Sequence, residues 1–291
     1  MGTFDGVHIG HQKIIEKLVQ SASENNCESL ILTFFPHPRM VLQERSEIQL
    51  LNTIDEKITL LEQNGLDNLI IHPFDEAFSR LTAEEFVSEI LVGQFKIKKI
   101  IIGHDHRFGR NRTANIDDLI VFGETYNFEV EQISAQEINE VSVSSTKIRN
   151  ALQNGNIVLA NDYLGYRYML NGTVVEGQKL GRTIGFPTAN LDIAEDYKLI
   201  PKVGVYIVSS FLDNRIVFGM MNIGTRPTLN ASTISIEVHF FDFNNSLYGQ
   251  KITISIIEYI RDEHKFESLE FLKAQLFRDR EHSLSRINLM R

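Results

Sequence analysis

Two histidines near the beginning of the chain are spaced for phosphate chemistry. Residues 2–11 read Gly-Thr-Phe-Asp-Gly-Val-His-Ile-Gly-His, so His8 and His11 flank Ile-Gly in a glycine-punctuated loop. Glycines let backbone N–H groups approach phosphate oxygens closely, and a helical pattern that starts near Gly10 adds the positive end of its dipole. Two imidazoles at such a place can donate hydrogen bonds to a phosphoryl group under attack. The loop is therefore predicted to hold a nucleoside triphosphate.

Two further segments of the first half could bind anions. Residues 144–149, Ser-Ser-Thr-Lys-Ile-Arg, put hydroxyls at the start of a helical pattern, where they can cap the helix or contact phosphate. Arg149, one turn in, can hold phosphate oxygens bidentately. Residues 103–112 carry three arginines and two histidines on one loop. His104 and His106 could bind a metal ion, but the arginines would repel a cation, so an anion clamp is favoured.

A carboxylate on an alternating strand is the candidate catalytic group of the second half. Residues 235–242 read Ser-Ile-Glu-Val-His-Phe-Phe-Asp, which puts Glu237 on the face opposite Ile236 and Val238. An outward carboxylate on a strand is usually only solvated. The pattern alone therefore leaves the role of Glu237 open.

The elements that must position these residues have two different periods. From the start to about residue 155, short apolar runs alternate with helical patterns, which predicts βαβ units around a parallel sheet. After Tyr168, short alternating strands between turn residues predict a small antiparallel β-barrel with one closing helix. Because parallel sheets bind ligands at the carboxyl ends of their strands, the loops with His8, His37 and Gly103 are expected to meet in one cleft.

The predicted elements have the following bounds. Thr82 followed by Glu85 is a capping box and sets the start of one helix. We expect strands at 29–35, 68–72, 97–103, 128–133, 203–211, 215–222, 235–243 and 251–259, and helices at 10–24, 54–64, 83–94, 116–126, 145–153 and 269–277, with a short connecting helix within 154–166.

Composition limits the classes of function. A length of 291 residues suits two domains, and 43% hydrophobic with 23% charged residues is typical of a globular protein. A net charge of −9 works against non-specific nucleic-acid binding. The single cysteine, Cys27, allows no intrachain disulfide, and no apolar run is long enough to cross a membrane. We therefore expect a cytoplasmic protein without nucleic-acid or membrane partners, and the oligomeric state stays open.

Taken in order, the motifs resemble those of bacterial bifunctional riboflavin kinases/FAD synthetases, and the resemblance covers nearly the whole chain. Residues 2–11 resemble the HxGH signature of the nucleotidyltransferase superfamily. Residues 33–38 and 144–149 resemble two further elements of flavin adenylyltransferases, and 103–109 resembles their Gly-x-Asp-Phe-x-Phe-Gly motif, with His106 where Phe is usual. Residues 171–191, which contain Pro-Thr-Ala-Asn, resemble the riboflavin kinase signature.

The resemblance implies a fold and two reactions. The expected fold is a Rossmann-like α/β nucleotidyltransferase domain with a parallel sheet over residues 1–155, followed by an antiparallel β-barrel riboflavin kinase domain with a closing helix over residues 166–291. The second domain would make FMN from riboflavin and ATP. The first would join FMN to AMP from a second ATP, which gives FAD and pyrophosphate. Mg²⁺ is the implied cofactor, and riboflavin, FMN, FAD and ATP are the implied small-molecule partners.

The resemblance also implies roles for individual residues. Glu237 would be the catalytic base, His8 and His11 would stabilise the adenylyl-transfer transition state, and Thr188 and Asn190 would hold Mg²⁺ with ATP. Arg226 and Arg261 would border the pockets. The residues implied in binding ATP are Gly2, Phe4, Asp5, Gly10, Ser144, Ser145, Thr146, Arg149, Gly172, Gly181, Thr188 and Asn190, and those implied in binding the flavin are His37, Gly103, Asp105, Phe108 and Arg261.

One departure from the family pattern and three alternative functions accompany this interpretation. In the family a strand precedes the Gly-Thr-Phe-Asp loop, whereas this chain supplies only Met1, so the first domain is expected to lack its first strand. A kinase with an inactive adenylyltransferase domain is the first alternative. A non-catalytic flavin- or nucleotide-binding regulator is the second, although Glu237, Thr188 and Asn190 are all present. A tRNA synthetase is disfavoured because no basic domain is visible.

Overall fold

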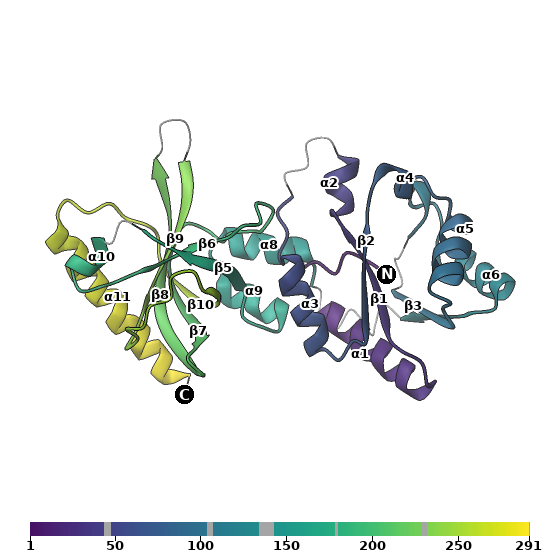
Figure 1. Ribbon diagram of the computed structural model, residues 1–291, viewed down its shortest axis with the longest axis horizontal. Helices are drawn as coiled ribbons and strands as arrows, with labels where there is room; N and C mark the ends of the chain where they lie inside the picture. Colours follow the sequence, from purple (N-terminus) through teal and green to yellow (C-terminus); the bar gives the residue numbers. More distant parts are fainter. Residues whose placement is uncertain (44–47, 104–106, 134–142, 178–179, 228–231, 291) are drawn as a thin grey trace. The chain divides into compact units, whose positions relative to one another are not determined.

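The structure is a computed structural model that describes residues 1–43, 48–103, 107–133, 143–177, 180–227 and 232–290. The chain divides into two compact units, Met1–Ser144 and Ser145–Arg291. Figure 1 labels the elements of both units. Each unit is described by itself.

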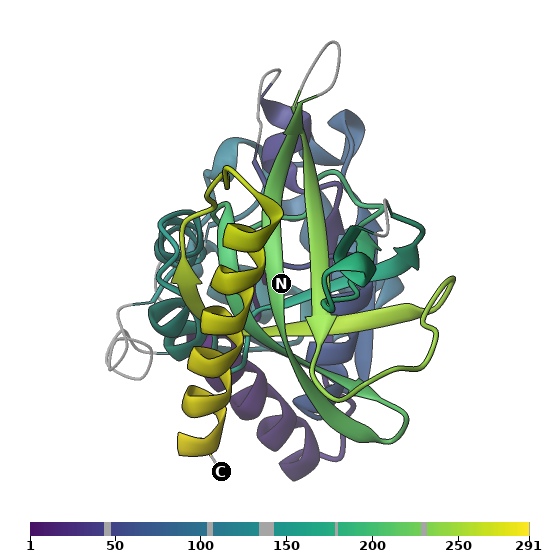
Figure 2. The same ribbon diagram turned by 90° about the vertical axis from the view of Figure 1, so that its left-hand side faces the viewer.

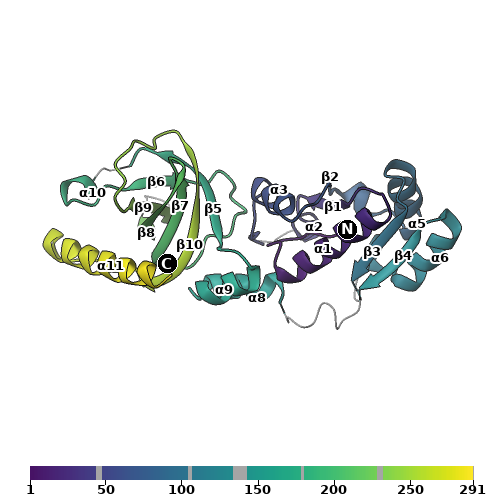
Figure 3. The same ribbon diagram turned by 90° about the horizontal axis from the view of Figure 1, so that it is seen from below.

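The first unit is built from parallel strand pairs and helices, as the alternation of apolar runs and helical patterns predicted. Strand β1 (Leu30–Phe35) pairs in parallel with β2 (Asn68–Pro73), and β3 (Lys99–Gly103) pairs in parallel with β4 (Glu129–Ile133), as Figure 3 shows from below. The helices of the unit are α1 (Ile9–Glu24), α2 (Pro38–Leu42), α3 (Ile54–Gln63), α4 (Glu76–Ser79), α5 (Ala83–Glu85), the π-helix η1 (Phe86–Gln94), the 3₁₀ turn η2 (Arg110–Arg112) and α6 (Ile116–Tyr126).

Local signals set the helix starts of this unit. The Thr82 hydroxyl accepts the Glu85 N–H at 3.2 Å and the Glu85 carboxylate accepts the Thr82 N–H at 2.8 Å, which is the predicted capping box. Helix α3 begins with the same arrangement between Thr53 and Glu56. The predicted helix at 83–94 is α-helical only to Glu85 and continues as a π-helix.

The strands of the first unit form two separate two-stranded sheets rather than one continuous sheet. A cavity of about 820 Å³ lies beside β1 and β3 and is lined by residues of both strands, among them Ile31 and Ile100, and by Met1. The Gly2 N–H donates to the Leu32 carbonyl at 3.0 Å, so the first residues already lie along β1. Within the described strands, β1 pairs only with β2 and β3 only with β4, so each has an edge that another strand could pair with.

The second unit is a closed six-stranded antiparallel barrel, as predicted, with strand order β10-β5-β6-β9-β8-β7. Helix α11 (Leu269–Leu289) lies across the strands, and Figure 2 shows it in yellow in front of them. The strands are β5 (Met169–Val175), β6 (Ala189–Asp192), β7 (Gly204–Leu212), β8 (Arg215–Pro227), β9 (Ser232–Phe240) and β10 (Lys251–Arg261), and the other helices are α8 (Ser145–Gln153), α9 (Ile157–Leu164) and α10 (Leu180–Thr183).

Several details of the second unit differ from the sequence prediction. Helix α10 was not predicted, β8 runs to Pro227 instead of residue 222, and β9 spans Ser232–Phe240 instead of residues 235–243. Strands β5 and β6 were not predicted, because their residues form part of glycine-rich stretches that do not alternate cleanly. The closing helix was predicted to end at Phe277 but runs to Leu289. The residues after Phe277 are mostly polar, so the sequence gives no sign that the helix continues. Asp279, Ser283 and Ile287 are nevertheless buried and extend the buried face of the helix.

We predict that a strand added at the open edges stabilises the first unit. An extension of about five β-branched residues before Met1 should raise the free energy of unfolding by roughly 1–3 kcal/mol, since apolar burial exceeds the cost of ordering. Urea unfolding and hydrogen exchange of the β1 and β3 amides measure this gain.

A Gly-Ser extension of equal length is the control for this experiment. It can reach the same edges but brings no apolar side chains, so it should add little protection. Equal effects of the two extensions on the β1 and β3 amides would contradict the prediction that a strand can bind in the cavity beside β1 and β3.

Candidate functional site

The two histidines of the first loop form a stacked pair. Their ring centroids are 3.7 Å apart with an interplanar angle of 14°. His8 is the N-cap of α1, and its Nδ1 accepts the His11 backbone N–H at 3.3 Å. Because Nδ1 of His8 accepts, a neutral His8 carries its proton on Nε2, where it can donate to a ligand.

Burial keeps both imidazoles neutral. Desolvation lowers the pKa of His8 to about 4. The pKa of His11 is also well below its usual value, chiefly through burial and further through the neighbouring His8 and Lys57. Within the described part of the chain, the buried Nδ1 of His11 has no hydrogen-bond partner. Buried polar atoms are almost always hydrogen-bonded, so this nitrogen is a candidate for contact with a bound ligand.

Several residues of the same loop pack around the histidine pair or anchor the loop. A Cβ at Gly10 would lie 3.3 Å from the His8 ring, so a larger residue would press against this ring. The Phe4 ring packs against His11 with centroids 5.1 Å apart. The buried Asp5 carboxylate accepts the Leu51 N–H at 2.9 Å.

A buried lysine supports the loop from α3. Lys57 is 3% exposed, and its ammonium donates to the Thr3 carbonyl at 2.8 Å. Burial lowers the pKa of Lys57, and the nearby Asp5 opposes this effect. Sequence reasoning missed Lys57, because a lysine on a helix is usually solvent-exposed.

The other predicted residues of the first half lie at several places. Gly2 bonds to β1, and His37 caps the short helix α2, where its Nδ1 accepts the Arg39 N–H at 3.1 Å. Gly103 ends β3, and Phe108 is buried in the core. His104, Asp105 and His106 lie outside the described residues.

The hydroxyl segment before α8 belongs to the second structural unit from Ser145 onward. Helix α8 begins at Ser145, as predicted, with Thr146 and Arg149 in its first turns and Ser144 directly before it. The structure therefore does not place Arg149 relative to His8 and His11.

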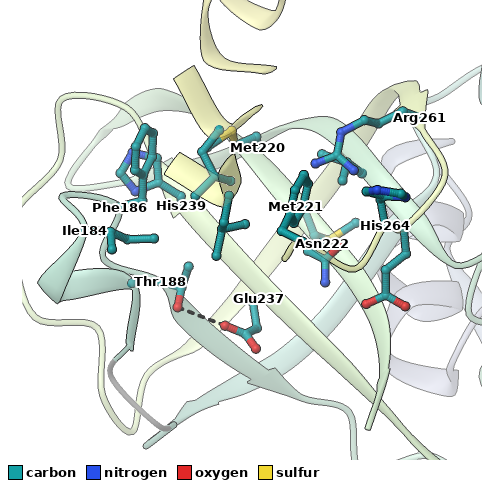
Figure 4. A pocket seen from close by; sticks show the side chains of 16 residues that line it. Ile184, Phe186, Thr188, Met220, Met221, Asn222, Glu237, His239, Arg261 and His264 are labelled. Carbon is teal, nitrogen blue, oxygen red and sulfur yellow. Dashed lines mark hydrogen bonds between the residues drawn. The ribbon is translucent and has the colours of Figure 1, made fainter. Parts of the chain in front are cut away.

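In the second unit, Glu237 faces a pocket. Thr188 Oγ1 donates to Glu237 Oε2 at 3.1 Å, shown by the dashed line in Figure 4. Glu237 is partly exposed on β9, whereas Ile236 and Val238 are buried, so the alternation predicted from sequence is present. The strand register places Asn190 of β6 and Asn222 of β8 on either side of Glu237. Directly paired residues share a face, so these three side chains form a row.

The pocket around Glu237 has a volume of about 360 Å³. Figure 4 shows Phe186 and His239 together at one end, Arg261 and His264 at the other, and Thr188 with Glu237 between them. His239 Nδ1 donates to the Pro187 carbonyl at 2.8 Å, and burial lowers the pKa of His239. Apolar side chains from the barrel and α11 complete the wall, namely Ile184, Val205, Met220, Met221, Leu272 and Leu276.

The predicted glycines of this half lie close to other chain segments. Gly181 lines the pocket, and Gly172 lies on β5 beside the Asp192 carbonyl. A Cβ at Gly177 would lie 2.2 Å from the Asn190 amide nitrogen. The Gly177 main chain therefore approaches Asn190 so closely that any other residue at 177 would displace the Asn190 side chain.

Among the residues that the structure describes, no group of three histidine, cysteine, aspartate or glutamate side chains is placed to hold a metal ion. Over the same residues, no helix has both the length and the apolar character needed to cross a membrane.

We predict that the His8 environment makes stability depend on pH. Unfolded His8 takes up a proton near pH 6.5 and folded His8 only near pH 4, so the unfolded state binds more protons between these values. Stability should therefore be fully present above about pH 6.5 and fall as pH drops toward about 4, by up to ~1.4 kcal/mol per pH unit for this group. Denaturant unfolding of the first unit at several pH values measures this dependence.

His8→Asn is the matched variant, because asparagine retains a side-chain oxygen for the N-cap but does not titrate. Over this range, the slope of its free energy of unfolding against pH should be smaller by the equivalent of about one bound proton. Identical pH dependence in the variant and the unchanged protein would show that His8 is not held neutral.

Comparison with known proteins follows the division into two halves. The family described as FAD synthetase matches residues 1–147, and the family described as riboflavin kinase matches residues 164–286. A relative from Buchnera aphidicola is 38% identical over 100% of this chain and 94% of its own length. Relatives from Listeria monocytogenes and Escherichia coli K12 are 37% and 36% identical over 96% of this chain and 88% and 89% of theirs. Each is named a bifunctional riboflavin kinase/FMN adenylyltransferase.

A solved structure shares the fold over nearly the whole chain. It is described as a macrolide-efflux protein from Streptococcus pneumoniae, with a TM-score of 0.88, 31% identity, and coverage of 97% of this chain and 92% of that one. That description concerns the Streptococcus protein. The two matched families and the full-length relatives show that this chain belongs to the bifunctional riboflavin kinase/FMN adenylyltransferase family.

Proposed function

We propose that this chain makes FMN from riboflavin and ATP at the pocket of the β-barrel, and FAD from FMN and a second ATP at the loop that carries His8 and His11. The domains proposed for these reactions are residues 166–291 and 1–155. The observation that carries the proposal is the Glu237 carboxylate, held by Thr188 at 3.1 Å in a largely apolar pocket. Family membership supports both halves.

In the kinase reaction, Glu237 acts as the general base. Its carboxylate takes the proton of the ribityl 5′-hydroxyl as that oxygen attacks the γ-phosphorus of ATP, and the bond between this phosphorus and the β,γ-bridging oxygen breaks to release ADP. The Thr188 hydroxyl donates to Glu237, which orients the carboxylate. The products are FMN and ADP.

The pocket composition supports a flavin ring beside Glu237. Phe186, Phe266 and Met220 line it, and Arg261 is its one arginine or lysine among the described lining residues. A flat, uncharged ring system fits such walls better than a triphosphate does. The triphosphate is proposed to lie beside Thr188 and Asn190, where Gly177 and Gly181 would let the main chain come close to the phosphates.

The residues near Glu237 also fit a magnesium ion. Thr188 and Asn190 supply a hydroxyl and an amide oxygen, and Mg²⁺ prefers a few oxygen ligands together with phosphate oxygens and water. When bound, the ion would neutralise charge on the ATP phosphates. The Thr188 oxygen could contact the ion through a lone pair while its O–H still donates to Glu237.

In the adenylyltransferase reaction, His8 and His11 act as donors. An FMN phosphate oxygen attacks the α-phosphorus of ATP, and the bond to the bridging oxygen on the pyrophosphate side breaks. Neutral imidazoles donate N–H groups to the phosphoryl oxygens, where charge accumulates in the transition state. We propose Gly2, Phe4, Asp5 and Gly10 as the surrounding ATP loop, with Arg149 on the pyrophosphate and His37, Gly103, Asp105 and Phe108 on the flavin.

The divided sheet of the first unit supports one second candidate, a kinase whose adenylyltransferase half is inactive. Conversion of FMN and ATP to FAD and pyrophosphate by the unmodified protein separates the two. We propose a cytoplasmic location for either case, which the single, exposed Cys27 supports.

We predict that the two reactions fail separately. Glu237→Gln should slow FMN formation from riboflavin by roughly 10²–10⁴-fold, because it removes the base. His11→Ala should slow FAD formation from FMN by about 10²-fold or more and leave FMN formation intact. Chromatography of products from riboflavin, Mg²⁺ and ATP measures both steps.

Glu258→Gln is the control, because Glu258 lies on β10 of the same barrel but does not line the pocket. It should retain FMN formation. Equal loss of both reactions in either test variant would refute the division of labour between the units.

A further inference from the structure

Arg261, at the end of β10, is held by a buried carboxylate from the closing helix. Its Nε donates to both oxygens of Asp279 at 3.1 Å, and its Nη2 donates to Oδ2 at 2.7 Å. Its Nη1 donates to the Asp262 carbonyl at 3.0 Å, and the Phe266 ring lies 5.8 Å from the guanidinium carbon. Three of the five N–H bonds of the guanidinium are thus used within the protein.

Asp279 is committed to this contact. It is 2% exposed on α11, and its Oδ1 also accepts Gln275 Nε2 at 2.8 Å. A carboxylate that is so buried needs a paired cation and hydrogen bonds to offset its lost hydration. Arg261 provides the cation, so the side chains of β10 and α11 fix one another.

The same helix supplies one wall of the pocket. Leu272 and Leu276 line it, and Asp279 follows one turn beyond Leu276. The hydrogen bonds of Asp279 to Arg261 and Gln275 therefore set both the orientation of the Arg261 guanidinium and the position of this apolar wall. Because Asp279 matches its charge, Arg261 contributes to the pocket as an oriented, neutralised group.

We propose that Asp279 is a positioning residue of the kinase reaction, which holds Arg261 and α11 as the wall that receives the flavin. The inference rests on the proposed riboflavin site beside Glu237. It assigns to Asp279 an effect on the flavin and not on ATP. Asp279 contacts Arg261 and lies on the same helix as Leu272 and Leu276. Thr188 and Asn190, beside which ATP is proposed to lie, come instead from the start of β6 and the residue before it.

The chain offers a matched control on the same two elements. Arg286 of α11 donates its Nε to Glu258 of β10 at 2.8 Å, and neither residue lines the pocket. Glu258→Gln removes the charge from this second contact between α11 and β10, as Asp279→Asn does for the first. It therefore reports how much general attachment of the helix matters.

The test compares Asp279→Asn with Glu258→Gln in the full-length protein. Asp279→Asn keeps the shape but removes the charge, so we expect KM for riboflavin to rise about tenfold while KM for ATP changes less than about twofold. The dissociation constant of riboflavin, read from flavin fluorescence without ATP, should rise by a similar factor. Glu258→Gln should leave all three constants near their original values, and Asp279→Glu should restore part of the riboflavin affinity.

Other outcomes overturn the inference. Equal changes in both variants, or a change in ATP KM as large as that for riboflavin, would make Asp279 merely structural. If Asp279→Asn does not fold, Gln275→Leu decides, because it removes one bond to Asp279 and leaves the ion pair. A riboflavin dissociation constant unchanged in Gln275→Leu would then refute the inference. Failure of the proposed function looks different, since the unmodified protein would form no FMN.

Discussion

The main-chain hydrogen bonds that close the β-barrel fix the kinase site. Because β6 pairs with β9 and β9 pairs with β8, Asn190, Glu237 and Asn222 lie in one row across three strands. A slip of one residue in either pairing would turn Glu237 to the opposite face, into the position of a buried apolar side chain. A closed barrel has no free edge at which such a slip could begin. The Glu237 carboxylate, the proposed catalytic base, is therefore positioned by the pairing of all three strands.

The first unit positions its histidines by local contacts instead. His8 caps α1, and His11 follows one turn later. Lys57 of α3 donates to the Thr3 carbonyl of the loop, and the Leu51 N–H donates to the Asp5 carboxylate of the loop. The two parallel strand pairs beside them leave open edges along a large cavity. The geometry of the His8 and His11 pair thus depends on helix capping and burial more than on a continuous sheet.

Much of this arrangement could be predicted from the sequence, because the relevant signals are local. The glycine loop with His8 and His11, the capping box at Thr82 and the alternation around Glu237 each depend on a few neighbouring residues. The Asp279 contact could not be predicted, since a polar run on a helix looks solvent-exposed until Arg261 is brought to it from another strand. Lys57 was missed for the same reason. The separation of β1 from β3 depends on tertiary pairing, which apolar runs do not encode.

That one chain carries two triphosphate sites is tested most directly by the number of nucleotides it binds. Native mass spectrometry or equilibrium dialysis at saturation with Mg²⁺ and a non-hydrolysable ATP analogue gives this number for the folded, full-length protein. Two molecules bound per chain are predicted, one beside Glu237 and one beside His8 and His11. A plateau at a single molecule per chain would contradict the assignment of a separate phosphate-transfer site to each unit.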